Sequence, residues 1–192
     1  DAPRQRNSRD ENNKIKNGEI PEEWEKPENK SKLAQKDTDA DWTKKNGERH
    51  FGYKDHVKCD ADSKLITNYS VTSASVHDSQ RCLVFIGQED EVLYADSAYS
   101  GKPIALALPE NCKNQICEKG YRNSPLTSEQ KMNNRRKSRI RCRIEQIFGF
   151  MTGAMHGITI RSIGITRAWM NIGITNLVYN FCRYSYLKRA SA

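Results

Sequence analysis

The chain has 192 residues, which is enough for one domain with a buried core. Only 36% of the residues are hydrophobic, and 32 Lys and Arg against 24 Asp and Glu give a formal net charge of +8, which favours a polyanionic partner such as nucleic acid over an acidic small molecule. The sequence has no apolar run of roughly 20 residues and begins without the apolar stretch of a signal peptide, so we expect a cytosolic protein without a membrane partner.

Residues 1–48 form a polar segment with three prolines and only scattered apolar side chains. We interpret this segment as a long loop or insertion that is partly disordered. Its acids Asp37, Asp39 and Asp41 lack the glycine and the distal glutamate of a calcium loop, so we expect them to be solvated.

From His50 onward, apolar and polar residues alternate, as is typical of a strand with one buried face. Residues 50–73 predict a β-hairpin with a four-residue turn at 60–63. Asp55 falls on the apolar face, where a buried hydrogen-bonding role is favoured over metal ligation. The next predicted elements are a helix at 77–86, a strand at 91–95, a short helix at 103–111 and a strand at 114–118. His77 and Asp78 open the first of these helices, where they either cap it or support a site near Asp96.

A long helix is predicted to begin at the capping box formed by Thr127 and Gln130. Its later part carries an apolar stripe that must be buried against the sheet. A final helix is expected at 165–187, so the chain predicts an α/β fold in which helices flank a mixed sheet. The apolar stripe of the long helix consists of Ile140, Ile144, Ile147 and Met151.

The six cysteines form no CxxC pair, and we expect them to be reduced thiols in the core.

Two acids are candidates for metal chemistry. Asp96 directly follows the predicted strand 91–95, and Glu145 lies on the flank of the helix stripe, four residues after Arg141. Divalent ions such as Mg²⁺ take oxygen ligands and bind through one or two carboxylates together with substrate phosphate. The alternative is that Asp96 caps the following turn while Glu145 pairs with Arg141, and the spacing alone does not decide between the two.

Several stretches occur in one order and carry a resemblance to a known family: HFGYKDHVKCDADSKLI, VTSASVHDSQ, VLYADSAYSG, KGYRNSPLT and RKSRIRCRIEQIFGFM. They resemble the DDE transposases of bacterial insertion sequences, in the insertion-sequence-five group, over nearly the whole chain. The resemblance implies a ribonuclease H-like catalytic domain at 49–192, in which three acids hold two metal ions, Mg²⁺ or Mn²⁺. Motif matching makes Asp96 the second acid and Glu145 the third, and their separation, 145 − 96 = 49, fits that group.

The chain departs from the family pattern in two places. Ser138 and Thr152 stand where the signature around the third acid has Tyr and Lys. The first acid of this group lies at a D-A-[ST] strand end upstream of the segment that opens this chain, so we expect the domain at 49–192 to lack its first strand. Asp1 is a less favoured substitute, because a terminal residue has no preceding strand to hold its carboxylate.

A basic run at 135–143 precedes Glu145 on the same predicted helix. We expect it to follow a DNA backbone, and a solvated face is the alternative. Tyr121 and Arg122 are predicted to stack on an unpaired base or to hold phosphate, whereas the plainer interpretation is a turn. The DNA-contacting cations expected in the run are Arg135, Arg136, Lys137, Arg139 and Arg141.

These observations together predict DNA transposition, with metal-dependent phosphodiester cleavage and strand transfer at transposon ends. The resemblance implies a homodimer on double-stranded DNA, in the bacterial cytoplasm at the nucleoid. Two alternatives stay open at this point: a catalytically inactive remnant that only binds DNA, and a nuclease of the same fold.

Overall fold

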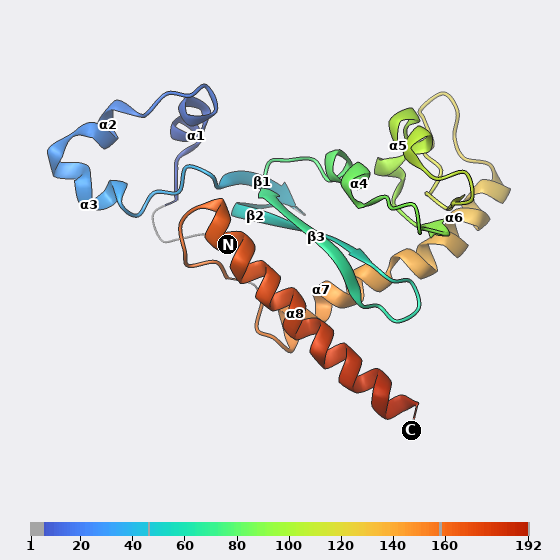
Figure 1. Cartoon of the computed structure of the whole chain (residues 1–192). Helices are drawn as coiled ribbons and strands as arrows, with labels where there is room; N and C mark the ends of the chain where they lie inside the picture. The colour runs from blue at the N-terminus through green and yellow to red at the C-terminus, as the bar shows by residue number, and fades with distance from the viewer. Residues whose placement is uncertain (1–5, 46, 158, 192) are drawn as a thin grey trace.

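The N-terminal segment contains regular structure. The computed structural model describes residues 6–45, 47–157 and 159–191. Its first elements are the helices α1 (Arg9–Lys16), α2 (Glu22–Glu25) and α3 (Lys30–Leu33), a 3-10 turn η1 (Pro27–Asn29) and the strand β1 (Asp41–Lys45) (Figure 1). The prediction of a long loop is therefore wrong here. A capping box between Ser8 and Glu11 starts α1, and the buried Trp24 donates an Nε1 hydrogen bond of 2.6 Å to Glu11 Oε1.

Two of the three acids predicted to be solvated are buried. The carboxylate of Asp37 accepts hydrogen bonds from the Tyr53 hydroxyl at 2.7 Å and from the Gly164 backbone amide at 3.1 Å. Asp41 is also buried and forms a 2.7 Å ion pair with Lys16. Asp39 is exposed and accepts the Ile165 amide at 2.9 Å. Asp37 and Asp41 were mispredicted because their partners lie far away in the sequence.

The predicted hairpin is confirmed. Strands β2 (Glu48–Cys59) and β3 (Ile66–Ser73) pair antiparallel from Tyr53 opposite Ser73 to Lys58 opposite Asn68, and β1 joins the far side of β2 to complete a sheet in the order β1-β2-β3. The turn is held by Asp60 Oδ1, which accepts the Ser63 amide at 2.7 Å.

The middle of the chain forms a second, smaller sheet. Helix α4 (Ser79–Phe85) leads to β4 (Val92–Leu93), the 3-10 turn η2 (Ser97–Tyr99), α5 (Lys102–Ala107) and β5 (Lys113–Asn114). β4 and β5 are parallel and pair with each other. The α/β class is confirmed, but the described residues form two sheets where one mixed sheet was expected. The reason is that none of the described strands bridges β2 and β4.

Three helices complete the fold: α6 (Ser128–Arg141), α7 (Arg143–Gly153) and α8 (Ile165–Ala190). The capping box at Thr127 and Gln130 is confirmed, and the predicted long helix is interrupted once, at Cys142. Among the residues that the structure describes, no helix has the length and apolarity needed to cross a membrane.

The core lies between the hairpin and helices α7 and α8 (Figure 1). Ile147 and Met151 of the predicted stripe are fully buried against Ile66 and Tyr179, with Ile144 at the edge of this cluster. Ile140, the first residue of the stripe, instead faces the β4/β5 sheet.

The cysteines are all free thiols, but the prediction that they belong to the core holds for only three of them. Cys82 and Cys117 are buried, and Cys59 is partly buried against the Ile147 cluster, whereas Cys182 is exposed on α8 and the other two are partly exposed. Burial raises the pKa of the Cys59 thiol to about 11, so this thiol is protonated at neutral pH.

Candidate active site and nucleic-acid interface

Asp96 follows β4 and opens the turn η2, but β4 ends at Leu93, so the acid lies three residues beyond the strand and not directly after it as the sequence predicts. Its carboxylate accepts hydrogen bonds from the Ser97 amide at 2.5 Å and from the Ser97 hydroxyl at 3.2 Å. The residue is exposed to solvent. The capping role that the sequence left open is therefore present, and the outer side of the carboxylate remains accessible.

Glu145 lies in the first turn of α7, with its side chain 61% exposed. Its Oε1 is 3.0 Å from Arg141 Nη2, across the junction between α6 and α7. This ion pair is the i,i+4 contact that the sequence offered as the alternative to metal binding. Because the Glu145 side chain is largely exposed, the pair contributes little stability, and Glu145 can exchange this partner for another at low cost.

Tyr99 is affected by charges from both parts of the candidate site. Burial, together with the negative charges of Asp78 and Asp96, raises the pKa of its hydroxyl to about 12, while the positive charge of Arg141 opposes this shift. Asp96 and Arg141 therefore act electrostatically on one side chain, and Arg141 is in turn paired with Glu145.

Asp78 is turned toward strand β2. It occupies the N-cap position of α4, but its side chain makes no capping hydrogen bond. Its Oδ1 lies 3.3 Å from Lys54 Nζ and 3.6 Å from His56 Nδ1. The capping interpretation is therefore wrong for this carboxylate, because two side chains of β2 attract it more strongly. His77 stays local, with its Nδ1 2.8 Å from the Ser79 hydroxyl.

His56 is a buried polar residue that the sequence did not single out. Its Nε2 is 2.8 Å from the hydroxyl of Thr72 on the neighbouring strand. Burial lowers the pKa of His56, partly offset by the negative charge of Asp78. The one feature of the sequence that could have pointed to His56 is its place on the polar side of an alternating strand, close to Lys54 and Asp55.

The donors at this site match a divalent ion in kind but fall short in number. Asp96 and Glu145 supply exposed carboxylate oxygens, the ligands that Mg²⁺ and Mn²⁺ prefer. Within residues 6–45, 47–157 and 159–191, however, no group of three or more His, Cys, Asp or Glu side chains is arranged to hold a metal. Asp1, the less favoured substitute for the first acid, lies outside the described residues.

Helix α6 divides the predicted basic run into two sets. Arg135, Arg136 and Arg139 are exposed, and no acid in the described part of the chain pairs with them. Lys137 points inward, donating to the Ile116 carbonyl at 3.0 Å, and Arg141 is held by Glu145. The outward set alone is free to meet a polyanion.

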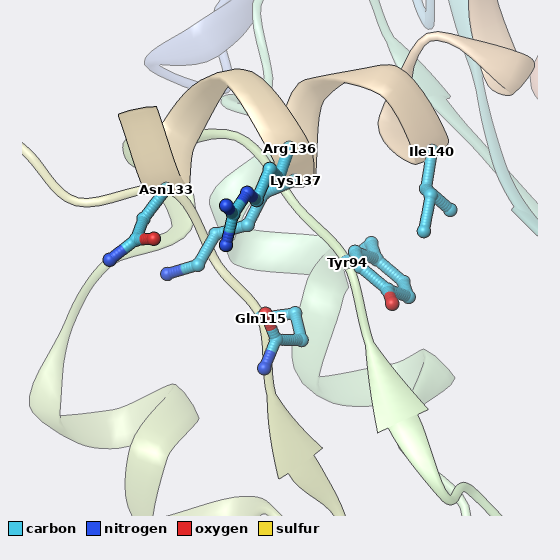
Figure 2. A pocket seen from close by; sticks show the side chains of 6 residues that line it. All are labelled: Tyr94, Gln115, Asn133, Arg136, Lys137 and Ile140. Carbon is cyan, nitrogen blue, oxygen red and sulfur yellow. The ribbon is translucent and has the colours of Figure 1, made fainter. Parts of the chain in front are cut away.

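A hollow of about 440 Å³ lies beside this helix, between α6 and the β4/β5 sheet (Figure 2). Arg136, Lys137 and Gln115 line its polar side, and Tyr94 and Ile140 its opposite side. Tyr94 precedes Asp96 by two residues, so the hollow borders the segment that carries the acid.

Tyr121 and Arg122 lie in a tight turn. The Tyr121 amide donates to the Ser124 carbonyl at 3.0 Å, and the Ser124 amide donates back at 3.1 Å. The Tyr121 ring is 64% exposed, with Lys119 Nζ 5.9 Å from its centre. The turn expected as the plain interpretation is present, and it exposes an aromatic ring beside a cation.

The two residues that depart from the signature around the third acid contact other residues of the chain. Thr152 donates to the Phe148 carbonyl at 2.9 Å, and the Ser138 hydroxyl lies 3.8 Å from the Cys117 sulfur.

Comparison with known families assigns the chain to one of them. Residues 7–181 match the transposase DDE domain family, and the chain belongs to that family. It is similar to the transposase for insertion sequence element IS1106 from Neisseria meningitidis serogroup B, with 34% identity over 117 residues. The matched region covers 59% of this chain and 40% of the relative's length. No solved structure matches the chain.

Proposed function

We propose that the chain acts in DNA transposition, as part of a ribonuclease H-like domain that cleaves and joins phosphodiesters at transposon ends in the bacterial cytoplasm. One observation carries the proposal: the outward cations of α6 lead directly to the Arg141–Glu145 pair, and the hollow beside α6 borders the segment that carries Asp96. A DNA backbone bound along α6 would therefore pass Glu145 and that segment.

The outward cations Arg135, Arg136 and Arg139 bind backbone phosphates in this proposal, which gives affinity without reading sequence. Lys137 and Arg141 have a different role from the one expected for them, because they have partners within the protein. They position the helix and Glu145. Tyr121 and Arg122 remain predicted contacts for an unpaired base or a phosphate near the transposon end.

Asp96 and Glu145 would hold a divalent ion, Mg²⁺ or Mn²⁺, together with a further acid that we expect upstream of Asp1. When bound, such an ion stabilises negative charge on phosphate oxygens. The solvent exposure of both carboxylates suits this role, because their present partners, Ser97 and Arg141, can be exchanged for a ligand without exposing buried groups.

Manganese binding tests the metal assignment. We expect the chain to bind Mn²⁺ weakly, measured by water-proton relaxation, and Asp96→Asn or Glu145→Gln to weaken that binding by roughly tenfold or more. Glu129→Gln is the matched control, since Glu129 is an exposed acid in the first turn of α6. Equal Mn²⁺ affinity in the wild type and both site variants contradicts the assignment.

A second candidate function is supported by the number of ligands. The described residues contain no group of three ligands that could hold a metal. The chain could therefore be a remnant that binds DNA through the exposed cations of α6 but does not cleave phosphodiesters. This candidate predicts DNA affinity that does not change when Mn²⁺ is added, whereas a metal shared with phosphate raises the affinity. A binding titration with and without Mn²⁺ separates the two.

A further inference from the structure

Helix α6 turns a mostly polar side toward the β4/β5 sheet. Asn133, Arg136, Lys137 and Ile140 lie at positions i, i+3, i+4 and i+7 of the helix, so they share one side of it and line the hollow of about 440 Å³ (Figure 2). A helix that packs directly on a sheet carries apolar residues at such positions. Only Ile140 is apolar here, so α6 stands over an open and polar hollow.

The sheet beneath α6 has one packed face and one face that borders the hollow. Leu93 and Ala95 pack with Ile116 on the side of α4 and α5. The backbone ladder continues past β4 as far as Ala95. Side chains alternate between the two faces along each segment, so Tyr94 and Gln115 lie on the face toward α6 (Figure 2). The floor of the hollow therefore consists of an aromatic ring and an amide.

Most polar groups that line the hollow are unpaired within the described part of the chain. Among the described residues, no side-chain hydrogen bond or ion pair involves Tyr94, Gln115, Asn133 or Arg136. Lys137 is the exception, because a backbone carbonyl of the protein accepts a hydrogen bond from its ammonium group. One phenol ring, two amides and one guanidinium are therefore available to a ligand.

The unpaired groups favour a nucleotide over a segment of protein. An apolar segment would bury the guanidinium and the amides without hydrogen-bond partners, and each buried unpaired group costs free energy. A nucleotide supplies a partner for every group: its base stacks on an aromatic ring, the edge of the base pairs with an amide, and its phosphate accepts hydrogen bonds from Arg and Asn. The net charge of +8 and the outward cations Arg135 and Arg139 on the same helix attract a polyanion to this point.

The size and the layout of the hollow fit one nucleotide. Ligand pockets have volumes of about 300 to 1,000 Å³, so a hollow of about 440 Å³ takes a single nucleotide and not a base pair. Figure 2 shows Tyr94 on one side, Asn133 and Arg136 on the other, and Gln115 between them. A base within a duplex is stacked and has its edge occupied by pairing, so only an unpaired base can enter.

We propose that this hollow binds one unpaired nucleotide of a DNA strand. The base stacks on Tyr94, Gln115 hydrogen-bonds the edge of the base, and Arg136 and Asn133 hold the phosphate at the other end. Because Tyr94 precedes Asp96 by two residues, the bound nucleotide lies beside the segment that carries this candidate acid. The site depends on the proposed function, which supplies DNA as the source of the nucleotide. A free nucleotide has the same chemistry and is the second possible source.

Fluorescence anisotropy with two labelled duplexes tests the site. One duplex is fully paired, and the other is identical except for a single-adenine bulge. We expect the chain to bind the bulged duplex about fivefold more tightly or better, because stacking on an aromatic ring adds to the backbone contacts. Tyr94→Leu and Gln115→Ala should each reduce this ratio of affinities toward one, whereas Tyr94→Phe, which keeps the ring, should retain it. Tyr184→Leu is the matched control and should leave the ratio unchanged, because Tyr184 is 57% exposed on α8.

The fluorescence of 2-aminopurine placed at the bulge reports stacking directly. Wild-type protein and Tyr94→Phe should quench it, and Tyr94→Leu should not, with circular dichroism unchanged in all three proteins. Excess dAMP should compete with the bulged duplex only weakly, because it lacks the backbone phosphates that bind the outward cations. If dAMP competes at concentrations equal to those of the duplex, the hollow is a site for free nucleotides and not for a DNA strand.

The remaining outcomes distinguish a failure of this site from a failure of the proposed function. Equal affinity of the wild type for the two duplexes overturns the site and leaves DNA binding intact. A preference for the bulge that Tyr121→Leu abolishes and Tyr94→Leu does not assigns the unpaired base to the exposed turn, and it also overturns the site. If the chain binds neither duplex, the proposed function is contradicted, and the site falls with it.

Discussion

Asp55 of β2 accepts a 3.3 Å hydrogen bond from the Nδ2 of Asn176, a residue buried on α8. The other oxygen of each side chain, Asp55 Oδ2 and Asn176 Oδ1, is buried without a hydrogen-bond partner among the described residues. Burial raises the pKa of Asp55 to about 7, against 3.8 for the ordinary side chain. A proton on Asp55 supplies a donor that Asn176 Oδ1 can accept, so the neutral acid suits this pair best.

The raised pKa of Asp55 predicts a pH dependence of stability. The native state binds more protons than the unfolded state between pH 3.8 and about 7, so the Asp55 contribution to the free energy of unfolding falls as pH rises through this window and is constant above it. The full effect is on the order of 4 kcal/mol, since one pKa unit corresponds to about 1.4 kcal/mol. Asp55→Asn, which keeps the shape and the donor, should gain stability over the wild type across the window, measured by urea unfolding from pH 4 to pH 8.

The comparison between variants isolates Asp55 from other acids. Hydrogen bonds and ion pairs lower the pKa of Glu11, Asp41 and Asp60 despite the opposing effect of burial, so these acids lose their stabilising contribution as pH falls. They act equally in the wild type and in Asp55→Asn. Asp62→Asn, at a fully exposed position in the hairpin turn, is the control and should leave the pH profile unchanged. A parallel profile for Asp55→Asn and the wild type contradicts the prediction.

Asp37 should be among the most sensitive positions for stability. Its buried carboxylate accepts the Tyr53 hydroxyl and the Gly164 amide, which joins the N-terminal segment to β2 and to the start of α8. Asp37→Ala leaves both donors without this partner, and we expect it to lower the free energy of unfolding by about 3–5 kcal/mol. The exposed Asp62→Ala should change it by less than about 0.5 kcal/mol. A small effect at Asp37, measured by urea unfolding, would mean that water replaces the carboxylate.

Local sequence patterns predict interactions between residues that are close together in the sequence, and they miss interactions between residues that are far apart in it. The turn at Asp60, the capping box at Thr127 and the Arg141–Glu145 pair join residues at most four positions apart. Local patterns predicted the first two and offered the third as one of two alternatives. The bond from Gly164 to Asp37 spans 127 positions, so the acid resembled a solvated loop residue. The same limit applies to the site, where the sequence predicted Asp96 and Glu145 separately.

The electrostatic surroundings of the site also depend on long-range packing. Tyr99 is close to the Asp78 charge because α4 packs beside η2, and no spacing in the sequence predicts this packing. Lys137 was predicted to contact DNA from its place in a basic run, yet the β5 segment holds it through the Ile116 carbonyl. Helical periodicity alone could have separated it from Arg135 and Arg139, which point to the other side of α6.

The outward cations of α6 should determine DNA affinity. We expect the triple variant Arg135→Ala/Arg136→Ala/Arg139→Ala to bind duplex DNA more weakly whatever the sequence. Each lost phosphate contact reduces the slope of log K against log salt by about 0.9, so three lost contacts reduce it by roughly 2.7. The control removes the same charge elsewhere, with Lys14→Ala/Lys26→Ala/Lys30→Ala at exposed N-terminal positions. Equal salt slopes for the two triple variants would make the basic run a solvated face.

The 192-residue chain alone should not cleave transposon-end DNA with Mg²⁺ or Mn²⁺. In-line displacement at phosphorus requires the attacking and leaving oxygens to be held together, and in two-metal sites that requires enough carboxylates for both ions. The described residues offer Asp96 and Glu145 and no group of three. A nicking assay on labelled duplex, with Asp96→Ala as the negative control, measures this directly.

Any nicking by the isolated chain would identify the missing ligand. Activity that Asp1→Ala abolishes makes Asp1 the first acid and contradicts our interpretation of an incomplete triad. Activity that survives Asp1→Ala but is lost in Asp96→Ala indicates another acid, and Asp78 is then favoured over Asp55, because Asp78 is exposed and acts on the same tyrosine as Asp96, whereas Asp55 is turned toward α8. Activity that persists in both variants excludes Asp96 from the chemistry, and with it the assignment of this site.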